Sequence, residues 1–281
     1  MRSLAAFAIL ATAFAAGPGP KHLFGKDNLI AWCIVPFDAK MRGPEERAAM
    51  LARLGFKRFA YDWRDKDIPT FDAEVDALRK HGISLDAFWT PYPADPAKAS
   101  KLPVILELLK RRGLKTQLWL SLGFDKGFDQ LPHAEKVEIA AAAVRRVAAL
   151  AKESGGSVGL YNHGGWYGEP ANQVEIIKKA GASNVGIVYN FHHGHDHMDA
   201  FPALMKTMLP YLMAVNINGM RTGQKILPVG QGDREKEMLR TVIASGYRGP
   251  IGILGHRAEI DAEEALRLNL DGLKALLPSL R

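Results

Sequence analysis

Histidine is concentrated in one short stretch of the chain. The segment VYNFHHGHDHMD, from Val188 to Asp199, contains four histidines, one asparagine and two aspartates. Imidazole and carboxylate groups bind transition metals, and imidazole also transfers protons near neutral pH. The segment is therefore compatible with a metal site, a substrate-reading loop or a solvated polar turn. Its position in the fold decides between these interpretations.

Short apolar runs alternate with amphipathic stretches from Asn28 onward, which is typical of parallel βα units. Eight strands are predicted, at Leu29 to Val35, Arg58 to Asp62, Ser84 to Trp89, Thr116 to Leu122, Val158 to His163, Val185 to Asn190, Leu212 to Asn218 and Ile251 to His256. The helices predicted between them include Pro44 to Leu54, Phe71 to His81, Lys101 to Arg112, Ala134 to Ser154 and Ala262 to Leu277. Eight such units predict a single (β/α)8 TIM barrel over residues 28–281. An open doubly wound sheet is the alternative, but the turn after the first strand lacks the glycine-rich motif that such a sheet uses.

Polar and aromatic residues collect at the predicted carboxyl ends of the strands, where (β/α)8 barrels hold their active sites. They are Asp62, Trp63, Trp89, Trp119, Ser121, Asn162, His163, Asn190 to His193, Asn216, Asn218 and His256. The histidine-rich segment is thus the exit loop of the sixth strand. Side chains alternate along a strand, so only one of His192 and His193 faces the barrel axis, and we choose His193. For His195 and His197, further out, a solvated loop is an equally good interpretation.

Several of these residues are suited to binding a sugar. Trp166 and Tyr167 follow a pair of glycines and are predicted to form a platform for the apolar face of a sugar ring, whereas Trp119 is expected to pack inside the barrel. Asn216 and Asn218 share one face of a strand and offer donors and acceptors for hydroxyl groups. The full predicted substrate-binding set is Asp62, Trp89, Trp166, Tyr167, Asn190, Asn216 and Asn218.

Five stretches have an order and spacing that point to a known family. They are VGLYNHGGWYGEP, VGIVYNFHH, MAVNING, LPVGQGD and GYRGPIGILGHRAEIDAEEALRLNLDGL. In them the sequence resembles the xylose isomerase-like barrel family, from about Asn28 to Leu277. That family includes sugar isomerases and epimerases, inosose dehydratases and the endonuclease IV group.

The resemblance implies a divalent ion held by a glutamate, an aspartate, a histidine and a second glutamate at four strand ends. In this sequence those positions fall on Glu169, Asn190, Asn216 and Leu254 or Gly255, so only the first keeps its ligand type. His193 matches a family histidine that lies three residues after the sixth-strand position. Mn, Zn, Ni or Co could still bind a mixed set of Glu169, His163, His193 and His256. The alternative is a metal-free site in which the histidines act as acid and base.

Glu169, His163, His193 and His256 are therefore the predicted catalytic residues. The resemblance implies proton transfer next to the carbonyl of a neutral sugar or keto-sugar. A keto-sugar lyase or dehydratase is the near alternative, because the same chemistry eliminates a leaving group on the neighbouring carbon. A non-catalytic sugar-binding protein with a degenerate metal site is the alternative from another class. A DNA nuclease is disfavoured, because that group needs more metal ligands and basic loops that face DNA.

The N-terminus has the features of an export signal. Arg2 precedes an apolar run from Leu4 to Ala16 that contains the small-x-small pattern Ala13-Phe14-Ala15, which predicts a signal peptide over residues 1–16 and export of the mature protein. An uncleaved anchor is the alternative. Residues 17–27 are interpreted as a lead-in segment. No other stretch is apolar enough to span a membrane.

Charge and cysteine content narrow the choice of partners. The formal net charge is +7, but the basic residues are interspersed with acidic ones, so no nucleic-acid surface is predicted. The single cysteine, Cys33, has no partner for a disulfide within the chain. A small-molecule carbohydrate is the predicted partner, and the sequence does not indicate an oligomeric state.

Overall fold

Eight parallel strands close into a barrel in a computed structural model that describes residues 20–280. The predicted signal peptide therefore lies outside the described residues. Around the barrel the strands follow the order β1-β10-β7-β6-β5-β4-β3-β2. Their bounds are Leu29–Trp32 (β1), Arg58–Tyr61 (β2), Ser84–Pro93 (β3), Gln117–Gly123 (β4), Ser157–Tyr161 (β5), Val185–Asn190 (β6), Leu212–Ile217 (β7) and Ile251–Leu254 (β10). The predicted single (β/α)8 TIM barrel is confirmed.

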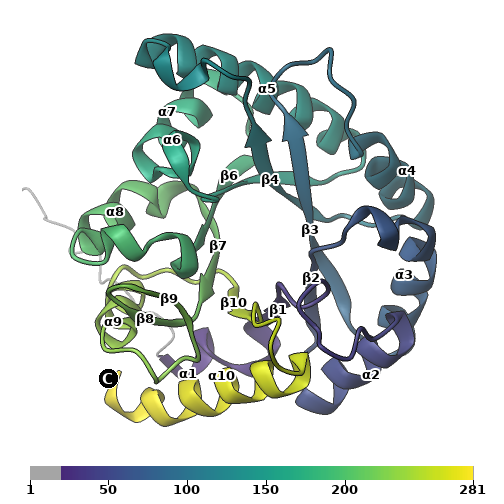
Figure 1. Cartoon of the computed structure of the whole chain (residues 1–281), viewed down its shortest axis with the longest axis vertical. Helices are drawn as coiled ribbons and strands as arrows, with labels where there is room; N and C mark the ends of the chain where they lie inside the picture. Colours follow the sequence, from purple (N-terminus) through teal and green to yellow (C-terminus); the bar gives the residue numbers. More distant parts are fainter. Residues whose placement is uncertain (1–19, 281) are drawn as a thin grey trace, which may run out of the picture.

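Helices surround the strands (Figure 1). Their bounds are Pro20–Leu23 (α1), Pro44–Leu54 (α2), Phe71–Lys80 (α3), Leu102–Arg112 (α4), His133–Glu153 (α5), Gly165–Gly168 (α6), Pro170–Ala180 (α7), Phe201–Met208 (α8), Glu235–Ala244 (α9) and Ala262–Leu276 (α10). Helices α2, α4 and α7 each end at a glycine with a left-handed backbone, which lets the chain turn back toward the next strand. Within residues 20–280, no helix combines the length and apolar character needed to cross a membrane.

The barrel interior is packed with large rings. Trp32 lies edge-on to Trp119 with ring centroids 4.6 Å apart, and Trp119 stacks on Tyr161 at 6.3 Å. Trp119 is fully buried, as expected for a packing residue. A glycine makes room where strands approach, because a Cβ on Gly159 would lie 2.4 Å from a methyl of Val188. The filled interior leaves the carboxyl ends of the strands as the place for a site.

Strand β1 is shorter than predicted, because Cys33 takes a φ of 60° and breaks the extended backbone directly after Trp32. An antiparallel hairpin, which the sequence did not indicate, follows β7: β8 (Gly219–Arg221) pairs with β9 (Gln224–Leu227).

Part of the predicted lead-in segment belongs to the fold. Leu23 and Phe24 are buried in the core. The Asn28 amide donates to the backbone carbonyls of Leu23 and Gly249, at 2.7 and 2.9 Å. This pair of bonds ties the segment before β1 to the segment before β10.

Candidate functional site

Four histidines form a continuous cluster at the carboxyl ends of the strands. His163 follows β5, His192 and His193 follow β6, and His256 follows β10. Ring centroids are 4.7 Å apart for His163 and His193, 4.5 Å for His193 and His192, and 5.3 Å for His192 and His256. We call these four residues the histidine cluster. The structure thus brings together the three histidines chosen from the sequence, and His192 links two of them.

Three members of the cluster, His163, His193 and His256, are uncharged near neutral pH. Burial, followed by the neighbouring imidazoles, lowers the pKa of His193 to about 3. Burial and then His192 and Arg64 lower the pKa of His256 to about 4. The pKa of His163 is also lowered, by partial burial and by Arg64. Neutral imidazoles carry one free lone pair and one N–H each, so the cluster can both accept and donate protons at pH 7.

Two asparagines, Asn162 and Asn190, link the carboxyl ends of strands β5 and β6 next to the histidine cluster. Asn162 accepts the backbone N–H of Asn190 at 2.7 Å, and its own amide donates to the Asn190 carbonyl at 3.1 Å. The Asn190 amide donates to the Tyr161 hydroxyl at 2.5 Å, and its side-chain oxygen accepts the N–H of His192 at 3.1 Å. Asn190 is fully buried. Its contacts therefore position the histidine cluster, whereas the sequence suggested direct substrate binding.

Asn216 and Asn218 do not present a shared polar face to the mouth of the barrel. Both are buried, and the Asn218 amide donates to the carbonyl of Gly219 at 2.8 Å. Asn216 lies next to Asn190 and Gly252 in the sheet, and a Cβ on Gly252 would lie 1.8 Å from its side-chain oxygen. Neither polar atom of the Asn216 side chain has a hydrogen-bond partner among the described residues. The binding of a sugar by these two asparagines stays a prediction.

Asp62 supports the exit of β1. One carboxylate oxygen accepts the backbone N–H groups of Ile34 and Val35, at 3.2 and 3.1 Å. The side chain is almost completely buried, and burial raises its pKa to about 7. These bonds hold the loop that contains Cys33 in its turn. Asp62 was predicted to bind substrate, and the structure gives it this positioning contact.

The aromatic residues divide into exposed and buried members. Trp89 is half-buried, donates its indole N–H to the Ser121 hydroxyl at 3.1 Å, and has its ring 6.5 Å from that of His163. Trp166 is also half-buried and lies edge-on to Phe128. Tyr167 is only 4% exposed and its hydroxyl donates to the Leu120 carbonyl at 3.1 Å. Trp89 and Trp166 can therefore contact a ligand, whereas the prediction of Tyr167 as a sugar platform is corrected by its place in the core.

Glu169 is paired with a residue outside the histidine cluster. Its carboxylate lies 2.9 Å from Nε2 of His197, a histidine that the sequence left as part of a solvated loop. Of the four residues predicted as the reactive centre, His163, His193 and His256 thus belong to the histidine cluster, whereas Glu169 contacts His197.

The residues present do not form a compact metal site. In the part of the chain that the structure describes, no group of three or more His, Cys, Asp or Glu residues is arranged to hold an ion. Asparagines 190 and 216 stand where charged or imidazole ligands were expected, and Glu169 is bound to His197. The predicted metal set of Glu169, His163, His193 and His256 is therefore not assembled, and we derive no reaction step through a metal.

The pairing of Glu169 with His197 makes a prediction about their variants. Glu169→Gln removes the charge of this contact and His197→Ala removes its imidazole. Because both changes weaken the same pair, they should alter turnover by similar factors, within about fivefold of each other, since residues that act as one unit have non-additive effects. The double variant should be no worse than the more damaging single one. Turnover measured for all three proteins checks this. If Glu169→Gln abolished turnover while His197→Ala left it intact, the carboxylate would have a direct chemical role.

Two residues at the mouth were missed by the sequence reasoning. The Arg64 guanidinium carbon lies 4.8 Å from the centroid of the Trp89 ring and 5.9 Å from that of Phe37. Phe37 in turn stacks against His256 with ring centroids 3.6 Å apart. Arg64 lies two residues after Asp62 at the exit of β2, so the rule that selected Asp62 and Trp63 could have found it.

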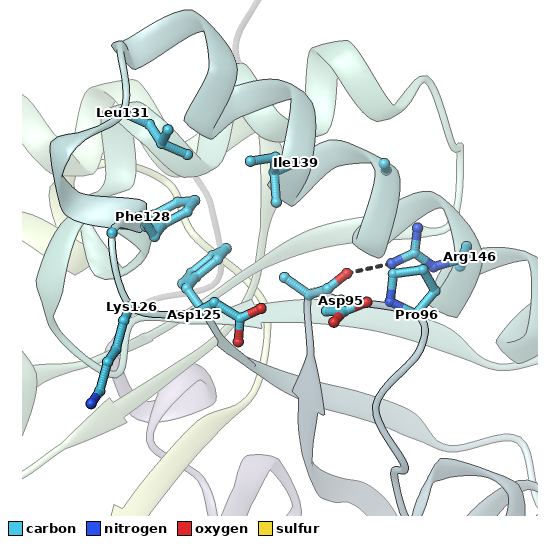
Figure 2. A pocket seen from close by; sticks show the side chains of 12 residues that line it. Asp95, Pro96, Asp125, Lys126, Phe128, Leu131, Ile139 and Arg146 are labelled. Atoms are coloured by element: carbon cyan, nitrogen blue, oxygen red, sulfur yellow. Dashed lines mark hydrogen bonds between the residues drawn. The ribbon is translucent and has the colours of Figure 1, made fainter.

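One cavity reaches His163 of the cluster, and a second cavity adjoins the first. The first, a polar one of about 190 Å³, is lined by His163, Ser121, Trp166 and neighbouring residues. The second, a more apolar one of about 500 Å³, lies between the loop after β4 and helix α5. Figure 2 shows the side chains of Phe128, Leu131 and Ile139 around the latter, with Asp95 and Asp125 at its edge. Both cavities share Phe124, Asp125 and Phe128, so the apolar one adjoins the space next to His163.

Comparison with known proteins gives one family and many similar folds. The family model for the xylose isomerase-like TIM barrel matches residues 48–276. A search of curated proteins gave no match.

Three solved structures illustrate the likeness. A 3-keto-D-glucoside 4-epimerase from E. coli is 17% identical, with a TM-score of 0.67, covering 89% of this chain and 100% of that one. The IOLI protein with a bound zinc atom is 12% identical, with a TM-score of 0.68 and coverage of 90% and 99%. D-Psicose 3-epimerase with D-tagatose, from Clostridium cellulolyticum, is 14% identical, with a TM-score of 0.63 and coverage of 90% and 99%. At these identities the likeness concerns the fold.

Proposed function

The chain belongs to the xylose isomerase-like TIM barrel family, and from that membership we propose that it is an enzyme that moves a proton next to the carbonyl of a sugar or keto-sugar. The observation that carries the proposal is the histidine cluster at the carboxyl ends of the strands. His163 and His193 lie with ring centroids 4.7 Å apart, which allows both to reach one small substrate. The epimerases among the similar structures support a carbohydrate substrate.

The chemistry needs a base and an acid in the same place. A neutral imidazole removes the proton from the carbon beside the carbonyl, and the electron pair moves to the carbonyl oxygen. A neighbouring imidazole N–H donates to that oxygen and so stabilises the negative charge that develops there. His193, the more buried member, is our choice for the base, and His163 is our choice for the donor. Return of the proton to the other face or the neighbouring carbon completes epimerisation or isomerisation.

Elimination is the second reaction that this arrangement supports. The cluster has further imidazoles beyond His163 and His193, and His256 lies 5.3 Å from His192 by ring centroids. The imidazolium formed when the base takes its proton can pass that proton, directly or through a neighbouring imidazole, to a leaving group on the carbon next to the deprotonated one, and so returns to the neutral form. A keto-sugar lyase or dehydratase therefore uses the same first step and differs only in the fate of the intermediate.

A divalent metal would add a Lewis acid at the carbonyl oxygen. The zinc-bound IOLI protein makes such an ion a reasonable candidate for a member of this family. The side chains here do not converge on an ion, so the proposal assigns the proton transfers to the histidines. The metal content of the purified protein should be measured by plasma mass spectrometry alongside every activity assay.

Hydrogen exchange tests the proposed function. The protein is incubated in D₂O with a panel of sugars and keto-sugars, with and without Mn, Zn, Ni or Co, and the carbonyl-adjacent C–H signals are followed by NMR. Loss of such a signal with deuterium incorporated and no group eliminated indicates epimerisation or isomerisation, and loss of a leaving group indicates a lyase. A protein that binds sugars but exchanges none of them would instead be a sugar-binding protein.

A further inference from the structure

Arg64 is a rigidly held cation at the mouth of the barrel. Its Nη1 donates to the backbone carbonyls of Asp62 and Trp63, both at 2.8 Å. The rings of Trp89 and Phe37 lie within 4.8 and 5.9 Å of the guanidinium carbon. These contacts fix the position of the guanidinium before any ligand binds.

Arg64 differs from Arg42, Arg47 and Arg58 in its ion-pair partners. Arg42, Arg47 and Arg58 each bind a carboxylate, at 2.7, 2.7 and 2.5 Å. Arg58 does so through its Nε and Nη2, the side-on fork that suits a planar carboxylate. Among residues 20–280, no carboxylate forms an ion pair with Arg64, and its Nε and Nη2 make no hydrogen bond. Neither nitrogen is among the buried side-chain atoms that lack a partner, so the open side of the guanidinium is accessible to solvent and to an anionic ligand.

The surroundings of Arg64 favour an anion close to the reacting groups. Of the carboxyls close to Arg64 in the chain, Asp62 is almost completely buried and has one oxygen bound to two backbone N–H groups, and Asp67 accepts the backbone N–H of Arg64 at 2.8 Å. Arg64 also lies close enough to His163 and His256 for its charge to act on both rings. An anionic group on Arg64 would therefore place the adjoining carbons of the same molecule beside the histidine cluster.

We propose that Nε and Nη2 of Arg64 bind a carboxylate of the substrate, which makes the substrate a sugar acid that keeps an aldehyde or keto group, such as a uronic acid. The proposal rests on the proposed function for the carbohydrate part of the molecule. It replaces the expectation of a neutral sugar. Arg64 is then the residue that selects the charge of the substrate.

Calorimetric titration at low salt tests the proposal with matched ligands. The probes are D-galacturonate, the neutral sugar D-galactose, galactose 1-phosphate and inorganic phosphate. The wild-type protein should bind galacturonate roughly ten- to one-hundredfold more tightly than galactose, as expected for a charge-assisted pair. Arg64→Gln should remove this preference, and Arg64→Lys, which keeps the charge but loses the fork, should retain only part of it.

Arg257 provides the matched control. It follows His256 directly, but its guanidinium is already bound to Glu259 at 2.6 Å. Arg257→Gln should therefore leave the preference for galacturonate unchanged. Thermal melting of each variant shows whether the fold is retained.

Several results would overturn the proposal. These are equal binding of galacturonate and galactose, a preference that survives Arg64→Gln, tighter binding of either phosphate ligand than of galacturonate, or no binding of any probe. The exchange assay separates this failure from failure of the proposed function. If the protein exchanges hydrogen on a neutral keto-sugar but binds galacturonate no more tightly than galactose, only the role of Arg64 is rejected. If it prefers galacturonate but exchanges no hydrogen, only the proton transfer is rejected.

Discussion

Replacing His193 by glutamine should slow solvent exchange at the carbonyl-adjacent carbon by about 10²- to 10⁴-fold, the usual contribution of a positioned general base. Glutamine preserves the polarity and approximate size of the side chain but cannot accept a proton. The fold should survive, because His193 is half-buried and lies in a short turn after β6. The rate constant for deuterium incorporation, measured with saturating substrate, gives the effect.

His81 provides a control for the general effect of removing an imidazole. It lies at the end of α3, where Nε2 is 3.0 Å from the carboxylate of Glu45, on the surface of the protein. His81→Gln should leave exchange within about twofold of wild type, as for other surface changes. If His193→Gln retained exchange at the wild-type rate, another group would be the base and the assignment within the cluster would be wrong.

Replacing Glu74 by alanine should lower the free energy of unfolding by about 3–5 kcal/mol, because it leaves the Arg47 charge buried without its partner. Arg47 on α2 and Glu74 on α3 are 2.7 Å apart, with side chains 7% and 1% exposed. Urea unfolding at pH 8 measures the loss. That pH is above the pKa of Glu74, which burial raises to about 7, so the carboxylate is ionised in the wild-type protein.

The exposed pair of Glu138 and Lys179 shows how much burial matters. Its charged atoms are 2.7 Å apart, but both side chains are about half exposed. Glu138→Ala should therefore cost less than about 1 kcal/mol. If both substitutions lowered the free energy of unfolding by the same amount, burial would add nothing to the stabilisation by the Arg47–Glu74 pair.

The barrel and the location of the site could be predicted because both depend on periodic patterns. Apolar runs that alternate with amphipathic stretches determine the βα order, and the order places the strand ends together. For this reason His163, His193 and His256, far apart in sequence, could be predicted to meet. The strand ends were less predictable: β1 stops at Trp32 because one residue, Cys33, has a left-handed backbone.

The detailed contacts of the site depend on how the side chains pack and point in three dimensions, which the residue types alone do not determine. Glu169 could face the histidine cluster or His197, and its sequence position allows both. Tyr167 and Trp166 are neighbours with similar chemistry, yet one is buried and the other partly exposed. Arg64 was not selected from the sequence, because its distinguishing feature is that no carboxylate among the described residues forms an ion pair with its guanidinium. Only the three-dimensional structure shows this.

The pH dependence of exchange by the wild-type protein tests the central claim, that a neutral histidine cluster transfers the proton. Because the pKa of His193 is lowered to about 3 and that of His256 to about 4, the base form persists well below the ordinary histidine range. After subtraction of the uncatalysed rate, the rate constant for deuterium incorporation should stay nearly constant from about pH 8 to about pH 5 and fall only below that. A decline centred near pH 6.5, or no exchange at any pH with a keto-sugar that binds, would contradict the account.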